Sequence, residues 1–120
     1  MKFLMKNKML PMCVTVLFVL LGSNPVLSAG DPVAGKEKSA ACVACHGADG
    51  NSVTPTFPKI AGQYKDYLFT SLMSYKNGQR NNAIMSGIVA ALSEQDMEDL
   101  AAFYASQEGL YTLGLEDAVK

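Results

Sequence analysis

The 120-residue sequence has no tryptophan and a single histidine, His46. A structural zinc site needs four ligands, usually cysteine and histidine. A hydrolase triad needs a histidine set between a nucleophile and an orienting acid. One histidine directly beside a cysteine matches neither arrangement. The scarcity of histidine therefore argues against a zinc protein and a hydrolase, and it leaves His46 as the one imidazole available for chemistry.

Apolar runs long enough to span a membrane are also absent. The longest run, Met9–Leu21, is interrupted by Pro11 and is shorter than the roughly 18 residues of a spanning helix. Three lysines precede it and small residues follow it as far as Ala29. This order is typical of a secretory signal, so we expect residues 1–29 to be a cleaved signal peptide and the mature protein to be periplasmic, with no stable membrane insertion. An uncleaved anchor is the alternative.

Basic residues are few once the signal is removed. The chain has 10 basic and 11 acidic residues, and the three leading lysines are lost with the signal. The resulting acidic excess argues against nucleic acid and anionic membranes as partners, because both need a basic face. Cys13 also lies in the signal, which leaves Cys42 and Cys45.

The stretch Cys42-Val43-Ala44-Cys45-His46 has the Cys-x-x-Cys-His spacing of covalent haem attachment. Thiols three residues apart share one helical face and can bond the two vinyl groups of a haem, with His46 as the proximal ligand. A disulfide, or free thiols beside a surface histidine, is the plain alternative. A thioredoxin-like pair should lie near a βαβ pattern, and none is visible. We therefore expect one covalent haem c as the cofactor.

The sixth position on the iron would go to a methionine sulfur, since no second histidine exists. After the signal the candidates are Met73, Met85 and Met97. Met73 and Met97 fit helical periods and have the character of core residues, whereas Met85 follows a polar loop. We therefore favour Met85. His46 also needs an acceptor for its other ring nitrogen, and the Pro58 carbonyl is one candidate among several in the loop.

Helical signals run through the mature chain, and no strand pattern is visible. Asp31 and Pro32 are typical of a helix start. The pattern predicts helices over 33–44 and 64–77, a short helix within 83–92, and a final helix from a capping box at Ser93 to about Gln107. It thus predicts an all-α fold of three main helices.

Three local features refine this prediction. A glycine inside the first helix, Gly35, predicts close approach of another helix. Residues at helical spacing predict one apolar stripe on each later helix: Tyr64, Tyr67, Leu68, Leu72 and Tyr75 on one, and Met97, Leu100, Ala101 and Tyr104 on the other. Residues 53–62 contain two prolines and should be ordered but irregular.

These motifs together resemble the class I c-type cytochromes of the small bacterial periplasmic kind, and one half of the dihaem cytochromes c. The residues that carry the resemblance are Gly35-Lys36, Cys42 to Gly47, Phe57 to Gln63, Tyr67-Leu68, Gly78-Gln79-Arg80, Met85, Leu92-Ser93, Asp96-Met97, Leu100-Ala101 and Tyr104. It covers residues 30–107 and implies a small cytochrome c fold wrapped around one haem. Residues 108–120 run past the usual end as a tail.

The resemblance also implies residue roles. Cys42 and Cys45 would form the thioethers, and His46 and Met85 would be the axial ligands. Three further residues have supporting roles: Pro58 would orient His46, Gly35 would let the first helix cross the last near Tyr104, and Arg80 would lie near the haem propionates. An ordinary exposed loop arginine is the alternative for Arg80. The single Cys-x-x-Cys-His excludes a second haem.

The expected function is electron transfer between redox protein partners by a periplasmic monomer that is not itself an enzyme. With both axial positions filled, iron cycles between its ferrous and ferric states without binding substrate. One alternative is a haem subunit fixed to a larger dehydrogenase or oxidase, suggested by the apolar Leu110–Leu113 in the tail. A haem peroxidase or sensor is a third hypothesis and requires that Met85 does not bind.

Overall fold

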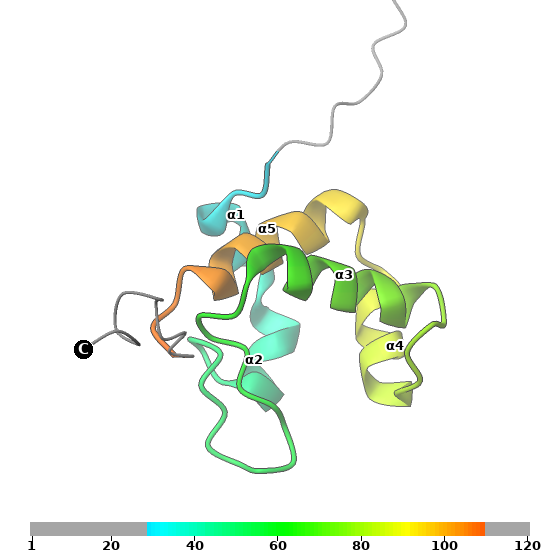
Figure 1. Ribbon diagram of the computed structural model, residues 1–120, viewed down its shortest axis with the longest axis horizontal. Coiled ribbons are helices and arrows are strands. Elements are labelled where there is room, and N and C mark those ends of the chain that lie inside the picture. The colour runs from blue at the N-terminus through cyan, green and yellow to red at the C-terminus, as the bar shows by residue number, and fades with distance from the viewer. Residues whose placement is uncertain (1–28, 110–120) are drawn as a thin grey trace, which may run out of the picture.

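Every regular element of the computed structural model, which describes residues 29–109, is a helix. The order is α1 (Pro32–Lys38), α2 (Ala40–His46), α3 (Lys65–Lys76), α4 (Ala83–Val89) and α5 (Glu94–Ala105) (Figure 1). The all-α prediction is confirmed. Within residues 29–109, none of these helices has the length and apolar character to cross a bilayer. The expected signal peptide and most of the tail lie outside the described residues.

Helix α1 begins as predicted but ends early. The Asp31 carboxylate caps it by accepting a 2.8 Å hydrogen bond from the Val33 amide, and Pro32 occupies the first turn. The prediction of one helix over 33–44 is wrong, because Ser39 separates α1 from α2. The Ser39 hydroxyl and amide both donate to the Lys36 carbonyl, at 2.7 and 3.3 Å. A side chain that bonds the backbone locally in this way competes with the helical ladder.

Helix α5 is the centre of the fold, and both α1 and α3 pack on it (Figure 1). Its capping box is formed as predicted, with Ser93 and Asp96 bonding each other's backbone amides. The predicted inner face is also confirmed, since Met97, Leu100, Ala101 and Tyr104 are all buried. Leu68 of α3 joins Leu100, Ala101 and Tyr104 in the core cluster.

The crossing of α1 and α5 depends on Gly35. A Cβ atom on Gly35 would lie 2.0 Å from the Asp99 carbonyl oxygen and 2.8 Å from Cβ of Phe103. Such distances leave no room for any side chain. The predicted close approach of a second helix is therefore confirmed. On α5 the contact runs from Asp99 to Phe103, just before Tyr104.

Helix α3 departs from the predicted stripe at its first residue. Tyr64 precedes the helix as its N-cap residue and is 66% exposed, whereas Leu68 is buried. The next stripe residue, Tyr67, is also exposed, so the buried part of the stripe starts at Leu68. The helix ends at Lys76, and Gly78 has the positive φ of 79° that suits the residue after a helix. Helix α4 packs on α3.

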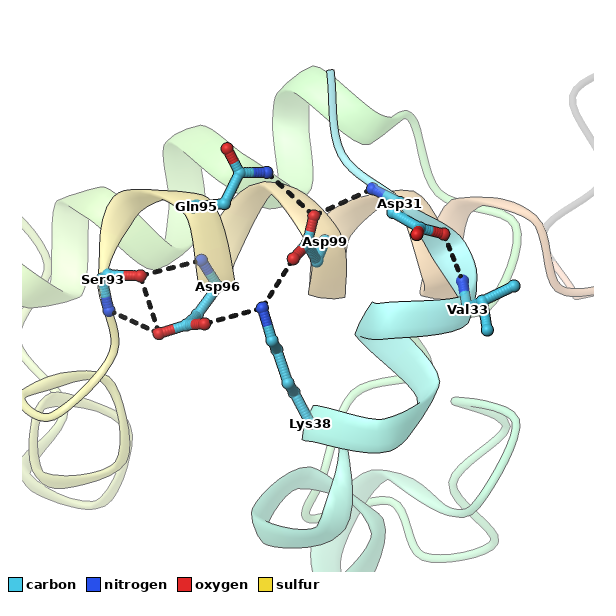
Figure 2. A network of polar contacts seen from close by, with 7 residues as sticks. All are labelled: Asp31, Val33, Lys38, Ser93, Gln95, Asp96 and Asp99. Atoms are coloured by element: carbon cyan, nitrogen blue, oxygen red, sulfur yellow. Dashed lines mark hydrogen bonds and ion pairs between the residues drawn. The ribbon is translucent and has the colours of Figure 1, made fainter. Parts of the chain in front are cut away.

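A polar network also joins α1 to α5 (Figure 2). Lys38 Nζ lies 2.8 Å from Asp96 Oδ1 and 2.6 Å from Asp99 Oδ2. The Asp31 amide and the Gln95 side chain donate to the other oxygen of Asp99, each at 2.9 Å. Burial pushes the pKa of Asp99 upward, but these bonds outweigh it and hold that pKa below its ordinary value.

Candidate functional site

Helix α2 presents Cys42, Cys45 and His46 on its last turns. Both cysteines are half-buried free thiols, so the disulfide alternative is not formed in this structure. Their separation of three residues places them on the same side of the helix. Cys42 packs against the core cluster, and burial raises the pKa of its thiol. Both sulfurs line the same cavity and are available for bonding there.

His46 is fixed by one hydrogen bond. Its side chain is buried, with the residue 7% exposed, and Nδ1 lies 2.8 Å from the Pro58 carbonyl oxygen. A carbonyl only accepts, so Nδ1 must carry the proton and donate, which leaves the lone pair of Nε2 free. Phe57 packs edge-on against the imidazole at a centroid distance of 6.4 Å. This arrangement of a backbone acceptor behind a free nitrogen is the one that metal-binding histidines use.

The loop between α2 and α3 brings Pro58 to His46. The Gly50 carbonyl accepts from the amides of Ile60 and Ala61, at 2.8 and 3.2 Å, and the Gly62 amide donates to the Tyr104 carbonyl at 2.9 Å. Gly50 has a φ of 83° and is packed against Tyr104, so a side chain would be both strained and blocked there. The predicted irregular but ordered loop is thus observed.

A cavity of about 420 Å³ lies against the Cys-x-x-Cys-His stretch. This volume is within the range of about 300–1,000 Å³ typical of cofactor pockets. The wall combines α2, the loop around Pro58, α3, α4 and α5. Its apolar and aromatic lining residues include Phe57, Ile60, Tyr67, Leu68, Leu72, Tyr75, Ile84, Ile88, Leu100 and Tyr104. A lining that is mostly apolar, with a few polar and charged groups, suits a large flat apolar group.

Met85 is the one methionine of the described residues that lines this cavity. Met97 is 0% exposed in the core and Met73 lies on α3 away from the lining. His46 and Met85 therefore reach the same space from α2 and α4. The position of Met85 is supported by Asn82, whose side chain accepts a 3.0 Å hydrogen bond from the Met85 amide. We did not predict this cap from the sequence, although an Asn before an apolar run is a usual N-cap signal.

Arg80 also lines the cavity, although its side chain is exposed. Its Nη2 donates to the Tyr67 hydroxyl at 3.0 Å, and its guanidinium carbon lies 5.6 Å from the ring centroids of both Tyr67 and Tyr75. These contacts attach the loop arginine to α3 beside the cavity. Helical spacing predicted both tyrosines on the apolar stripe of α3, but it gave no sign of their contact with Arg80.

The site fits a haem in two respects, which are the donor atoms around the cavity and a buried hydroxyl that lacks a hydrogen-bond partner. Two thiols, an imidazole with a free nitrogen and a thioether all border one apolar cavity. The Tyr104 hydroxyl, buried at the same wall, has no hydrogen-bond partner among the described residues, and burial raises the pKa of that hydroxyl. An unpaired buried hydroxyl costs free energy, so the protein alone does not complete this wall. The group that fills the cavity would be held by Cys42 and Cys45.

Comparison with known proteins identifies relatives that contain the same stretch of chain. Residues 32–108 match the Cytochrome c family. The chain is 44% identical over 111 residues to cytochrome c4 of Pseudomonas aeruginosa, which covers 92% of this chain and 53% of that protein. It is 46% identical over 83 residues to cytochrome c-554(548) of Halomonas halodenitrificans, covering 67% of this chain and 100% of the relative.

A solved structure agrees with these sequence matches. The crystal structure of reduced recombinant cytochrome c4 from Pseudomonas stutzeri superposes with a TM-score of 0.65 at 46% sequence identity, covering 68% of this chain and 48% of that one. The chain thus spans about half the length of the cytochrome c4 relatives and the whole length of the Halomonas protein.

Proposed function

The chain belongs to the cytochrome c family and carries haem c, and from that premise we propose that it is a periplasmic electron carrier with His46 and Met85 as axial ligands. The observation that carries the proposal is that these two side chains, from different helices, line one cavity together with Cys42 and Cys45. Bound haem supplies an iron that accepts and releases one electron. The protein would supply the attachment, the axial ligands and the surrounding wall.

The roles of the protein groups follow from their chemistry. Cys42 and Cys45 would hold the haem by thioether bonds and so keep it through every redox cycle. The Pro58 carbonyl keeps the His46 ring in one tautomer and orientation, since it accepts the Nδ1 proton. The Met85 thioether is a soft donor, which favours the reduced state and raises the potential. With both axial positions taken by protein side chains, the iron would have no free position for a substrate, in keeping with a carrier that is not an enzyme.

Periplasmic location and a redox protein as partner are further parts of the proposal. The signal pattern of residues 1–29 supports export, and the acidic excess of the remaining chain supports a soluble carrier that does not bind nucleic acid. We expect a monomer that meets its donor and acceptor in brief, small contacts. The boundaries of the mature cytochrome domain at 30–107 stay a prediction.

Visible spectroscopy of the purified periplasmic protein tests the ligand set. After denaturation in pyridine and alkali, the spectrum of one covalent haem c per chain is expected. The oxidised native protein should show the far-red sulfur-to-iron band, and Met85→Leu should lose it. Met73→Leu is the matched control and should keep the band, because Met73 does not line the cavity. A band that persists in Met85→Leu would contradict the assignment and leave room for a sensor or peroxidase.

The native size of the protein tests the second candidate function. The apolar Leu110–Leu113, outside the described residues, motivates a haem subunit fixed to a larger dehydrogenase or oxidase. Gel filtration of an untreated periplasmic extract should place the haem absorbance at the size of a free small protein. Haem absorbance that elutes only with a large complex would favour the subunit instead.

A further inference from the structure

Arg80 is held at the cavity wall by two tyrosines from one face of α3. The bond from Arg80 Nη2 to the Tyr67 hydroxyl is 3.0 Å, and the guanidinium carbon is equally far, 5.6 Å, from the two ring centroids. Tyr67 and Tyr75 are eight residues apart and so lie on the same face of the helix. We call Tyr67, Tyr75 and Arg80 the arginine clamp.

The backbone supports the clamp from the other side. The Arg80 amide donates to the Ser74 carbonyl at 2.9 Å, which folds the loop after α3 back onto that helix. An exposed arginine normally samples many rotamers in water. Here a hydrogen bond and cation–π contact with two rings restrict it to one place. The same bond and charge lower the pKa of the Tyr67 hydroxyl, as expected for a phenol that accepts from a cation.

The Arg80 guanidinium is one of few charged groups at a cavity that is mostly apolar. Among the residues that line it, the cationic side chains are Lys59 and Arg80, and none of the lining residues is acidic. Lys59 has no hydrogen bond or ion pair of its side chain among the described contacts, so Arg80 is the cation with a fixed position. A fixed positive charge beside a redox site disfavours the oxidised form, because that form carries one more positive charge.

We propose that Tyr67 and Tyr75 are positioning residues that hold the Arg80 guanidinium at the cavity wall, where its charge raises the reduction potential of the bound haem. This inference rests on the proposed function and extends it from the iron ligands to the electrostatics of the site. The tyrosines act through Arg80. Their removal therefore matters only while Arg80 is present.

Reduction potentials of single and double variants of the haem-loaded protein test this dependence. Arg80→Met should give the largest fall in potential. Tyr67→Phe keeps the ring but removes the hydroxyl, and it should give a smaller fall, as should Tyr75→Leu. In the Arg80→Met background, neither tyrosine change should shift the potential further. Equal shifts from Tyr67→Phe in both backgrounds would overturn the proposal, since the tyrosine would then act by itself.

Four comparisons separate the effect of the arginine clamp from general effects on the potential. Tyr64→Phe alters an exposed tyrosine outside the cavity, and Lys36→Met removes an exposed cation on α1; both should leave the potential nearly unchanged. Arg80→Lys keeps the charge without the planar fork and should also lower the potential. The difference in reduction potential between the unmodified protein and Arg80→Met should become smaller as salt is added, because salt screens exposed charges. A shift in potential for Arg80→Met that is no larger than the shift for Lys36→Met would overturn the proposal.

The spectra of the same samples distinguish failure of the clamp from failure of the proposed function. Every variant should retain the pyridine–alkali spectrum of covalent haem c and the far-red methionine band. If the unmodified protein lacks them, the proposed function is wrong and the clamp falls with it. If the spectra are intact and the shifts of Tyr67→Phe and Arg80→Met simply add, the proposed function stands and only the clamp is wrong.

Discussion

The junction of α1 with α5 and the cavity wall formed by α3 and α4 are built in different ways. At the junction the protein completes its own contacts. Gly35 lets backbone meet backbone, and Lys38 pairs with Asp96 and Asp99, so that the buried carboxylate of Asp99 has partners on both oxygens (Figure 2). These contacts are all made between groups of the protein and need no ligand.

The cavity wall is incomplete by comparison. Helix α4 has only seven residues and packs on α3, and of its apolar side chains Val89 is buried while Ile84 is 61% exposed. Ile84, Met85 and Ile88 line the cavity instead of a protein core. A haem bound in the cavity would cover them. The junction is therefore the part that the chain folds by itself, and the wall is the part that the cofactor finishes.

A pair of glycine substitutions tests this contrast with the largest expected effect. Gly35→Ala should destabilise the protein by about 3 kcal/mol, because its Cβ meets the Asp99 carbonyl and the two helices must move apart. Gly87→Ala, in α4, meets no atom within 4 Å and should stabilise its helix by up to about 1 kcal/mol. Urea unfolding of the haem-loaded variants measures both. Similar effects at the two positions would mean that the junction is no tighter than the wall.

Acid should weaken the junction through its carboxylates. Hydrogen bonds from Lys38 and Ser93 lower the pKa of Asp96 to about 2, and the pKa of Asp99 is lowered as well. A carboxylate with a depressed pKa stabilises the fold above its unfolded pKa of about 3.9, and this stability is lost as the pH falls towards the folded value. For Asp96, which is partly exposed and screened, the loss is about 1 kcal/mol between roughly pH 5 and pH 2.

The slope of stability against pH provides the measurement. Asp96→Asn should lower stability at neutral pH and flatten the decline on the acid side. Glu94→Gln, an exposed carboxylate of the same helical turn, is the matched control and should leave the decline unchanged. Urea midpoints at several pH values report both. A decline as steep in Asp96→Asn as in the unmodified protein would contradict the role of Asp96 in the acid sensitivity.

Much of the junction was predictable because its signals are local. Asp31-Pro32, the Ser93 capping box and the buried face of Met97 to Tyr104 all act within one or two helical turns. Gly35 by itself predicted a close approach, and the resemblance was needed to name the last helix as its partner. The break at Ser39 was missed, since a single serine in an Ala- and Lys-rich stretch gives little warning that its hydroxyl will take the Lys36 carbonyl.

The cavity wall was predictable only where a motif spans it. The motif from Cys42 to His46 predicted the attachment point, and the choice of Met85 over Met73 and Met97 needed the resemblance as well as exclusion. The contacts among Arg80, Tyr67 and Tyr75 join a loop to a helix face and depend on where the loop after Gly78 returns. Periodicity cannot show that return. It also placed Tyr64 on the stripe, although the helix begins one residue later.

The N-caps of α5 and α4 offer the smallest effect and the most direct comparison. Ser93→Ala removes the hydroxyl that accepts from the Asp96 amide, and Asn82→Ala removes the oxygen that accepts from the Met85 amide. Each loss should cost about 1 kcal/mol of helix stability. The consequences should differ, because α5 packs on α1 and α3, whereas α4 packs on α3 and would otherwise rest on the bound haem.

The far-red methionine band reports that difference. Ser93→Ala should lower the urea midpoint and leave the band intact, since the capped helix bears no ligand. Asn82→Ala should weaken the band or speed displacement of the sulfur by added imidazole, because the first turn of α4 carries Met85. Asn82→Ser restores a capping oxygen and should recover most of the band. If Asn82→Ala behaved like Ser93→Ala, with stability reduced and ligation untouched, α4 would be as well supported by the protein as α5, and the cavity wall would not depend on its cofactor.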